Sequence, residues 1–527
     1  MPSVNADAVA FLLLAFVVSR VVKILRGLKA VDGIPGFRCA LSARSPFGAL
    51  FNRSMHPIFF NPGTDFLWQL KDSLYDTYDV ISLVPFVHGP PAIFISSWDT
   101  ARQITGHTAP IDKPFNVVNS WVIFGENVVT SQTDIWKRHR RIVAPAFSQK
   151  THELVWVESI RTYNDMSKTE GWETQDFVGV PVINHITHKF AYSIISTCAF
   201  GLPFSWDESA TDTGATMSTH EAIGVAALTF PLRALYPQWV YYLPFKSISR
   251  IEQAYSTLDS FMRTQVTLRN TETNHQTWVE AGRNGSQNDV FSRIVQASQQ
   301  GGKLALDERE VIGNTFLMLF AGHETTAHSL AATVGLLGVY QEEQEIAYQQ
   351  IQAVLADGRE PTLEDFGSLD KVLNCFLEGL RLFPAAAQLA REATEDIVLK
   401  VRSNKPGIED REMVLKKGAH VHVDVIGINY NPRNFPDPKA FKPSRWANKN
   451  LENDHFGFGH GPRSCLGRKF ALYEAICFLS LLLRDWKVEV ALRPGETREE
   501  WRQRVMTGKV ETAFAPSPIP VNLRRRV

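Results

Sequence analysis

Apolar and polar positions follow a helical period over most of the chain, and the clearest case is the segment 307–340. Asp307 precedes an apolar run and Glu310 follows three residues later, a spacing typical of a capping box. The run continues to Leu337 without a proline and predicts one helix of about thirty residues, much longer than average. Shorter extended patterns occur at 79–96 and near the C-terminus. The pattern predicts a mainly α fold with minor β (α+β).

A second apolar stretch lies at the N-terminus. Residues 8–19 are uncharged, but they fall short of the roughly 20 residues that span a bilayer. The stretch reaches Leu25 if Arg20 and Lys23 extend to the membrane surface. A cleaved signal peptide would carry positive charge before its apolar core, whereas here the positive charge follows it, which favours a cytosolic body. We predict a membrane anchor over residues 1–31; an interfacial or buried helix is the alternative.

The remainder shows no internal repeat and no linker. Residues 32–37 contain two glycines and a proline, which predicts a turn-rich hinge between anchor and body. The polar stretches 205–220 and 270–290 are typical of loops that join helices. Residues 32–527 are therefore predicted to form a single large helical domain with small sheets.

Composition excludes two classes of function. Lys plus Arg and Asp plus Glu both number 55, so no basic surface favours nucleic acid. The five cysteines include no CxxC pair, so neither a disulfide framework nor a four-cysteine zinc site is indicated. Reduced thiols in a cytosolic environment fit this pattern, and one cysteine can carry chemistry of its own.

The segment 321–328, AGHETTAH, lies near the middle of the long predicted helix. A zinc protease needs two histidines four residues apart on one helical face. His323 and His328 are five apart and diverge by about 140° around a helix, so they do not support a zinc site.

Small and polar residues of the same segment offer another arrangement. Gly322 and the neighbouring Ala321 would open a groove where a flat group can lie against the backbone. Glu324 and Thr325 beside such a groove can relay protons into an apolar site. The alternative is that Thr325 bonds to a carbonyl one turn earlier and merely bends the helix.

A glycine-rich loop surrounds Cys465. Gly459, Gly461 and Gly467 let backbone N–H groups turn toward the sulfur and let a large planar group approach. Arg463 adds positive charge, which favours the thiolate. Such a thiolate is a strong axial donor to heme iron; the alternative is a glycine-rich loop with a buried free cysteine.

Residues 458–467 resemble the heme-binding loop of the cytochrome P-450 family, F-x-x-G-x-R-x-C-x-G, at every fixed position. The resemblance implies that the cofactor is heme b (iron protoporphyrin IX) and that the fold is that of the family. Cys465 would be the axial ligand of the iron and Arg463 a partner of a heme propionate. The remaining residues expected at the cofactor are Phe458, Gly459, Gly467 and Gly322.

Four further segments match family motifs. They are 136–140 (W-x-x-x-R), 321–326 (A/G-G-x-D/E-T-T), 378–381 (E-x-x-R) and 441–446 (F-x-P-x-R-F/W). In the family, the residues that Glu378, Arg381 and Arg445 match form a buried structural network under the cysteine loop. Trp136 and Arg140, four residues apart, would face one propionate, and Arg391 occupies another position that often binds a propionate.

The implied reaction is monooxygenation with O2, in which Thr325 delivers protons and Glu324 stands upstream. No flavin or nicotinamide fingerprint is present, so electrons would come from an NADPH-dependent flavin reductase. Candidate docking residues are Lys137, Arg138, Arg468 and Lys469. The resemblance to membrane-anchored members implies the endoplasmic reticulum membrane with a cytosolic catalytic domain.

The substrate is expected to be bulky and apolar. The chain is similar to fungal members of the family that modify terpenoids and other secondary metabolites, and the alanines 385–387 would leave volume beside the heme. Alternatives are sterol or fatty-acid oxidation, a heme-thiolate isomerase or reductase that inserts no oxygen, and a non-enzymatic heme sensor.

Overall fold

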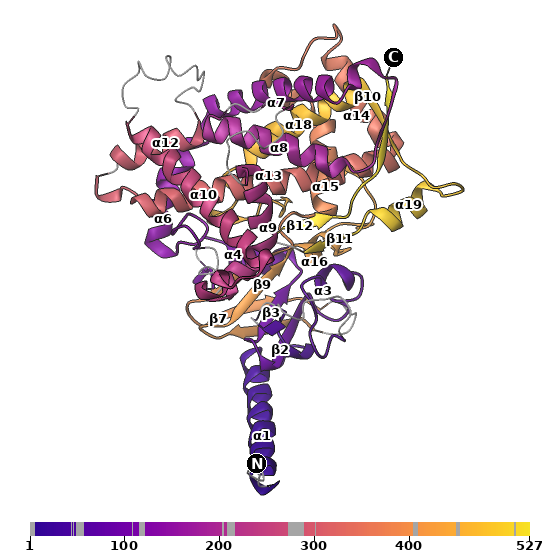
Figure 1. Cartoon of the computed structure of the whole chain (residues 1–527). Coiled ribbons are helices and arrows are strands. Elements are labelled where there is room, and N and C mark those ends of the chain that lie inside the picture. The colour runs from indigo at the N-terminus through magenta and orange to yellow at the C-terminus, as the bar shows by residue number, and fades with distance from the viewer. Residues whose placement is uncertain are drawn as a thin grey trace. The chain divides into compact units, whose positions relative to one another are not determined.

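The computed structural model describes residues 6–43, 45, 47–48, 57–107, 109–114, 122–202, 205–207, 217–271, 289–300, 302–403, 409–449, 454–510 and 513–526. The predicted loops 205–220 and 270–290 lie largely outside these residues. The α-helices (Figure 1) are α1 (Ala6–Ala30), α3 (Phe66–Gln69), α4 (Trp98–Thr105), α6 (Thr133–Val143), α7 (Gln149–Thr169), α8 (Ile183–Phe200), α9 (Thr219–Leu235), α10 (Lys246–Thr271), α12 (Val290–Gln300), α13 (Glu308–Val339), α14 (Gln341–Val354), α15 (Asp370–Leu382), α16 (Val425–Tyr430), α18 (Arg468–Asp485) and α19 (Arg498–Val505).

Short 3-10 helices and strands complete the described elements. The 3-10 helices are η1 (Ala144–Ala146), η2 (Trp172–Thr174), η3 (Gln238–Tyr242), η4 (Gly302–Leu304), η5 (Leu363–Ser368), η6 (Pro443–Trp446) and η7 (Gly461–Arg463). The strands are β1 (Gly36–Leu41), β2 (Val80–His88), β3 (Ala92–Ile95), β4 (Ile111–Asp112), β5 (Phe177–Val180), β6 (Gln388–Ala393), β7 (Ile397–Val401), β8 (Arg411–Leu415), β9 (His420–Asp424), β10 (Trp486–Val490), β11 (Gly508–Val510), β12 (Phe514–Pro516) and β13 (Val521–Arg525). The predicted mainly helical fold with small sheets is confirmed.

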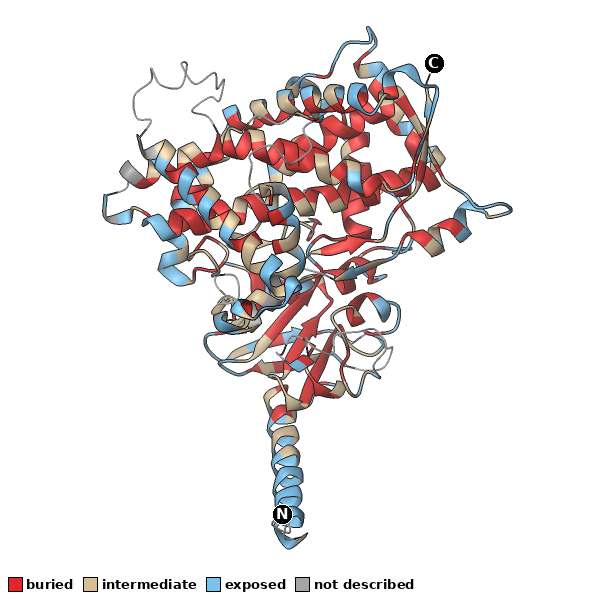
Figure 2. Ribbon diagram, in the orientation of Figure 1, coloured by how far each residue is buried: buried red, intermediate tan, exposed pale blue. Residues whose placement is uncertain are grey.

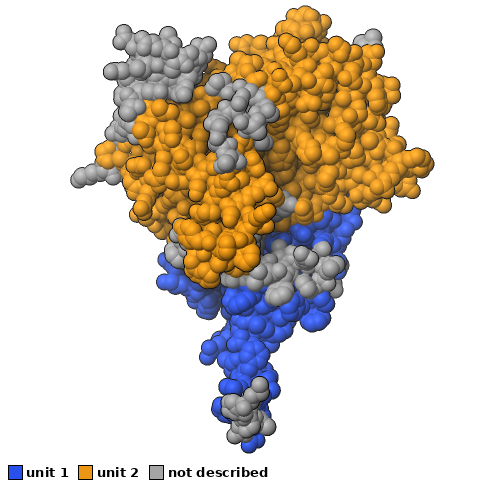
Figure 3. Space-filling model, in the orientation of Figure 1, with its two compact units in different colours: residues 1–114, 387–439, 460–463 blue, residues 115–386, 440–459, 464–527 orange. Residues whose placement is uncertain are grey.

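The contacts divide the chain into two compact units, and neither is continuous in sequence (Figure 3). Unit 1 comprises residues 1–114, 387–439 and 460–463, and unit 2 comprises 115–386, 440–459 and 464–527. Because each unit is assembled from separated segments, no single composition shift along the sequence marks the division.

Unit 1 is built on a six-stranded mixed sheet with the order β1-β2-β3-β9-β6-β4. The apolar pattern at 79–96 becomes the antiparallel pair β2 and β3, in which Val80 lies opposite Ile95. At the other edge, β4 pairs antiparallel with β6 and places Asp112 opposite Glu392. Arg391, the neighbour of Glu392 on β6, is therefore held close to β4.

Helix α1 of unit 1 is apolar and exposed over its N-terminal half (Figure 2). By length and composition residues 7–30 could cross a membrane, with a mean hydropathy of 2.4. Its C-terminal half packs on β2: Arg20 Nη1 and Lys23 Nζ donate to the Val87 carbonyl at 2.8 and 3.0 Å. A Cβ on Gly27 would lie 2.5 Å from Val84 Cγ1, so only glycine fits this approach. The two cations therefore bind the end of the strand, rather than extending freely from the helix.

Unit 2 is organised around α13, a helix of 32 residues. It packs against α8, α15, α18 and β10 and is buried along most of its length (Figure 2). Asp307 accepts the Glu310 N–H at 2.8 Å and the Glu310 side chain accepts the Asp307 N–H at 2.9 Å, so the predicted capping box is confirmed. Two small sheets, β10-β13-β5 and β11-β12, complete the unit.

One carboxyl group in unit 2 is buried without groups that would solvate it. Glu474 on α18 is 0% exposed, and neither carboxyl oxygen has a hydrogen-bond partner among the described residues. Burial raises the pKa of Glu474 well above its ordinary value, because no nearby charge compensates the lost solvation of the anion. The raised pKa favours the neutral acid, and a buried carboxyl without a hydrogen-bond partner is expected to destabilise the interface.

We expect Glu474→Met, which removes both oxygens at similar volume, to raise the free energy of unfolding by about 1–3 kcal/mol at neutral pH. The folded pKa lies above the unfolded value of about 4.3, so the wild-type acid must take up a proton on folding. The penalty therefore grows as pH rises above about 4, and the gain should be larger at about pH 7.5 than at about pH 5.

Denaturant unfolding of the intact protein at both pH values measures this gain. The exposed Glu364 provides the control, and Glu364→Met should change stability by less than about 0.5 kcal/mol. A loss of stability in Glu474→Met at both pH values would contradict the assignment of an unpartnered acid.

Candidate functional site

The loop that carries Cys465 is closed by its own backbone. The Cys465 N–H donates to the Phe458 carbonyl at 2.8 Å, and the Gly459 N–H donates to the Phe456 carbonyl at 2.8 Å. Gly459 adopts φ +73°, a left-handed conformation that favours glycine. Of the five cysteines, Cys465 alone is exposed, and the other four are buried. The loop therefore presents one accessible sulfur on a fixed backbone.

Of the two other glycines of the motif, Gly461 is required for a close approach, whereas Gly467 leaves space beside the sulfur. Gly461 has φ +73°, and a Cβ there would lie 2.0 Å from the Thr105 carbonyl oxygen, within unit 1. In unit 2, a Cβ on Gly467 would lie 4.0 Å from Cys465 Sγ and 3.6 Å from the Phe147 ring. A side chain at Gly467 would therefore extend into the space beside the sulfur.

Opposing effects act on the thiol of Cys465. Desolvation by the surrounding chain raises its pKa, whereas the Gly467 N–H and the charges of Arg468 and Arg140 lower it. The backbone donor and the cations favour the thiolate, which is the form that ligates a metal. On balance the pKa is raised, because desolvation is the largest of these effects, and a positively charged partner such as an iron centre would favour the thiolate further.

A buried ionic network lies in the same unit. Glu378 and Arg381 on α15 are both 0% exposed, and Arg381 donates to the two Glu378 carboxyl oxygens at 2.9 Å each. Arg445 on η6 donates to Glu378 Oε1 at 3.2 Å. The structure thus brings together all three residues that the sequence motifs place in the network.

Two further residues at this network, Trp446 and His455, were not predicted from the sequence. Trp446 Nε1 donates to Glu378 Oε2 at 3.0 Å. The ring of His455 lies 3.1 Å from the Leu377 carbonyl through Nε2 and accepts the Gly457 N–H at 2.9 Å through Nδ1. Burial lowers the pKa of His455 to about 4, so the ring is neutral and can accept that N–H. Trp446 was visible as the last residue of its motif, whereas no spacing signals His455.

Helix α6 presents the predicted tryptophan and arginine in contact with each other. The Arg140 guanidinium lies 5.7 Å from the centre of the Trp136 ring, and its Nη1 donates to the Ser464 carbonyl at 3.2 Å. Burial lowers the pKa of Arg140. Arg140 is therefore held next to the sulfur-bearing residue, with other guanidinium N–H groups left for an anion.

Arg138, on the same helix, has a structural partner that the sequence did not indicate. It binds the Glu310 carboxylate and donates to the Ala305 carbonyl at 3.1 Å. Its role as a docking cation stays a prediction.

Unit 1 contributes a separate group of cations. Arg463 Nη2 binds Asp112 Oδ1 at 2.7 Å, and Arg391 on β6 is 8% exposed. Burial, then the charge of Arg463, lowers the pKa of Arg391 to about 10. Burial and the charges of Arg391 and Arg463 also lower the pKa of Lys113. Three cations around one carboxylate favour an anionic ligand; the sequence motifs indicated neither Asp112 nor Lys113.

The central segment of α13 corrects one prediction. A Cβ on Gly322 would lie 2.5 Å from Ile195 Cδ1, so this glycine faces α8 and permits close helix packing. The prediction that Gly322 opens a groove for a flat group is therefore wrong, because its missing side chain points to a neighbouring helix. Ala321 is exposed and is the small residue on the open face.

The polar residues of this segment each have local partners. Thr325 Oγ1 donates to the Ala321 carbonyl at 3.0 Å, which is the geometry of the structural alternative, and Glu324 is half-buried. His323 Nδ1 lies 2.9 Å from the Leu319 carbonyl, and His328 Nδ1 lies 3.3 Å from His188. The two histidines thus have separate partners.

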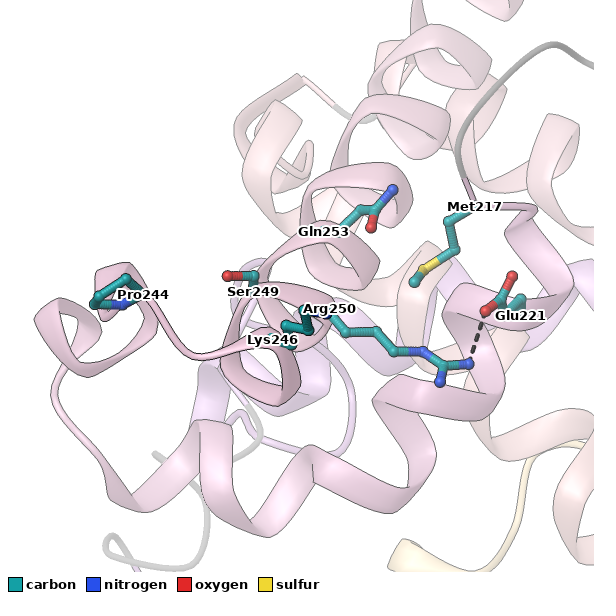
Figure 4. A pocket seen from close by; sticks show the side chains of 7 residues that line it. All are labelled: Met217, Glu221, Pro244, Lys246, Ser249, Arg250 and Gln253. Carbon is teal, nitrogen blue, oxygen red and sulfur yellow. Dashed lines mark hydrogen bonds and ion pairs between the residues drawn. The ribbon is translucent and has the colours of Figure 1, made fainter.

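An open surface groove of about 530 Å3 lies elsewhere in unit 2, between α9 and α10 (Figure 4). Arg250 reaches across it and binds Glu221 at 2.8 Å. Its lining residues are Met217, Glu221, Pro244, Lys246, Ser249, Arg250 and Gln253. None of the predicted cofactor residues is among them, so the groove is not assigned to the candidate site.

The residues of the site fit an iron porphyrin. In unit 2, one accessible sulfur can ligate the iron, Gly467 places no side chain beside it, and Arg140 can neutralise a carboxylate. Among the described residues, no cluster of three or more His, Cys, Asp or Glu side chains could hold a bare metal ion. A thiolate with cations is a donor set for heme, and not for a free divalent cation.

Comparisons with known proteins agree with this chemistry. Residues 59–513 match the family model described as Cytochrome P450. The chain is 32% identical over 509 residues to "Cytochrome P450 monooxygenase 124" of Postia placenta, covering 94% of this chain and 95% of that protein. It is 25% identical to "Cytochrome P450 monooxygenase prx9" of Penicillium rubens, covering 80% and 78%. It is 26% identical to human "Cytochrome P450 4F12", covering 75% of each.

We expect Arg381→Lys to cost about 3–5 kcal/mol, because lysine cannot make the paired bonds and leaves Glu378 partly uncompensated in the interior. Arg445→Lys should cost less, since Arg445 is 13% exposed and makes one bond to the carboxylate. Unfolding midpoints of both variants test this order. Equal losses would contradict the central place of the Glu378–Arg381 pair.

Proposed function

Because the chain belongs to the cytochrome P450 family, whose members are heme-dependent monooxygenases, we propose that it hydroxylates a bulky apolar substrate, a terpenoid or related secondary metabolite. Electrons would come from an NADPH-dependent flavin reductase. The observation that carries this proposal is the accessible sulfur of Cys465 on its closed glycine loop. The similarity to named monooxygenases of fungi supports the proposed fungal setting.

We assign each cofactor contact to a residue of this chain. Cys465 would ligate the iron, and Phe458, Gly459 and Gly467 would shape the loop around the sulfur. Arg140 with Trp136 in unit 2, and Arg391 with Arg463 in unit 1, would bind the propionates. When bound, heme supplies the activation of O2; the chain's own residues hold it, exclude water and move protons.

Thr325 and Glu324 are the proposed proton carriers. The Thr325 hydroxyl donates to the Ala321 carbonyl, and its oxygen lone pairs can accept a hydrogen bond from a donor on the open face. Glu324, the next residue and half-buried, can supply a proton to the site. To pass a proton on, Thr325 must release its own hydroxyl hydrogen from the Ala321 carbonyl as it accepts another, so the relay requires this local bond to open.

An aromatic cluster near the same segment supports an apolar substrate. The Phe124 and Phe316 ring centres lie 4.6 Å apart, and Phe316 and Phe320 lie 5.6 Å apart, one turn before Ala321. Ala385 and Ala387 are buried, and Ala386 between them is exposed. Aromatic and small residues of this kind suit an extended hydrocarbon skeleton better than a charged molecule.

We also propose a reductase-binding surface and an N-terminal membrane anchor. Lys137 and Lys469 are exposed cations of unit 2 and, with Arg468, are the proposed contacts of the reductase. The apolar N-terminal helix supports membrane anchoring, and we propose the endoplasmic reticulum with the catalytic part on the cytosolic side.

The proposal is tested by coexpression with a flavin reductase and candidate terpenes, followed by mass spectrometry for products heavier by one oxygen atom. The dithionite-reduced protein with carbon monoxide should show the long-wavelength Soret band of sulfur ligation. Cys465→Ser should lose that band and the product, whereas Cys375→Ala, at a buried cysteine, should keep the band. A folded wild-type protein without the band would overturn the thiolate assignment.

The proton assignment has its own test. We expect Thr325→Ala to bind heme normally but to release a larger share of its reducing equivalents as hydrogen peroxide, with product formation about tenfold or more lower. The matched control is Thr326→Ala, because Thr326 is buried and bonds to the Gly322 carbonyl at 3.3 Å. NADPH consumed per product formed is measured for both. Full coupling in Thr325→Ala would remove it from the relay.

A further inference from the structure

We propose that Glu310, at the N-terminus of α13, is a positioning residue for the Cys465 loop and acts through α6. The inference rests on the proposed role of Cys465 as the heme ligand. It concerns a cluster made by the buried His139, Glu310 and Asn314 with the half-buried Arg138; Arg138 and His139 occupy variable positions of the W-x-x-x-R segment, and the other two lie outside the motifs. All of them lie in unit 2.

Glu310 has two functions that use different oxygen atoms. Its Oε2 accepts the Asp307 N–H at 2.9 Å and closes the capping box of α13. Its Oε1 binds Arg138 and lies 3.3 Å from His139 Nε2. Since Arg138 and His139 are neighbours on α6, this one carboxylate ties the start of the central helix to α6.

Asn314, one turn further along α13, extends the contact. Its Nδ2 donates to His139 Nδ1 at 2.9 Å and to the Glu310 carbonyl at 2.7 Å. His139 Nδ1 is therefore an acceptor, and the proton of the neutral ring lies on Nε2, 3.3 Å from Glu310 Oε1 without the geometry of a hydrogen bond. His139 and Asn314 are both 0% exposed, and burial is the main cause that lowers the pKa of His139. The hydrogen bond from Asn314 thus fixes this buried ring of α6 against α13.

The segment before α6 is fixed at the same place. The Val128 N–H donates to Asn314 Oδ1 at 3.0 Å. A Cβ on Gly313 would lie 2.5 Å from the Gly125 carbonyl oxygen, and one on Gly125 would lie 2.0 Å from the Arg309 carbonyl oxygen. The backbone that leads into α6 therefore lies in close contact with the first turns of α13.

The opposite side of α6 carries the link to the sulfur. Residues 138 and 140 are about 200° apart around a helix, so their side chains leave on opposite sides. Arg140 donates to the carbonyl of Ser464, the residue before Cys465, at 3.2 Å. A shift of α6 relative to α13 would therefore move a cation that bonds to the thiolate loop. Such outer contacts orient a ligand and tune the metal it holds.

The test compares two acids in the first turn of α13. Glu310→Gln retains the side-chain size but removes the charge that binds Arg138. Glu308→Gln is the matched control, because Glu308 is exposed and lies 3.4 Å from the exposed Arg263. The full-length heme protein is measured for transfer of heme to apomyoglobin, for conversion of its carbon monoxide complex from the long- to the short-wavelength Soret band, and for its midpoint potential.

We expect Glu310→Gln to accelerate heme loss and the Soret conversion by about tenfold or more, and to shift the potential, while Glu308→Gln behaves as wild type. A Glu310→Gln protein that matches Glu308→Gln in all three measurements would overturn the positioning role. A wild-type protein that lacks the long-wavelength band would instead overturn the ligand assignment beneath it.

A second pair of variants keeps the test decisive if Glu310→Gln does not fold. Arg138→Gln leaves the capping box intact and removes its partner, and the exposed Arg141→Gln on the same helix is its control. We expect Arg138→Gln to change the same measurements in the same direction, with Arg138→Lys restoring part of the wild-type behaviour. No difference between Arg138→Gln and Arg141→Gln would reject the inference.

Discussion

The candidate site depends on one constraint: the sulfur of Cys465 must be accessible and anionic at the same time. A thiolate next to packed chain is unfavourable, because the chain removes water that would solvate the charge. The protein offsets this with a backbone N–H at Gly467 and with the cations Arg140 and Arg468. A side chain at 467 would start at van der Waals distance from the sulfur, so the glycine leaves this space open. These residues offset the cost of the thiolate only in part, since the pKa of Cys465 remains raised.

The loop is supported from the interior by groups that carry no chemistry. The Glu378 carboxylate accepts hydrogen bonds from two arginines, an indole N–H and the backbone N–H of Lys442. Its negative charge is therefore compensated by protein groups in place of water. His455 connects this network to the loop. Its ring contacts the carbonyl of Leu377, the neighbour of Glu378, and accepts the N–H of Gly457 in the loop. A neutral imidazole is suited to this position, because a charged ring could not accept that hydrogen bond.

The sequence predicts the features in which a local spacing has a single structural meaning. The capping box, the long central helix and the extended segment that becomes β2 and β3 are of this kind, whereas the grouping of Glu378 with Arg381 and Arg445 was implied by the family resemblance. Gly322 was interpreted wrongly because a missing side chain signals close approach but does not identify the neighbour, here Ile195 on α8. The ion pair of Arg138 was not predicted because its partner Glu310 lies far away along the chain. Asp112, Lys113 and His455 are defined by tertiary contacts that no periodicity encodes.

The central helix shows how packing prevails over local propensity. α13 contains four glycines, each of which costs a helix about 1 kcal/mol relative to alanine. At each of them a neighbour takes the place of the side chain: Gly125 at Gly313, Ile195 at Gly322, Met506 at Gly335 and Val490 at Gly338. Van der Waals contact along a buried helix offsets the lost propensity. Because these four contacts hold the helix on its closed sides, the face with Ala321 and Thr325 stays in a fixed orientation. The glycines that appear to weaken the helix are thus the positions at which neighbouring elements fix it.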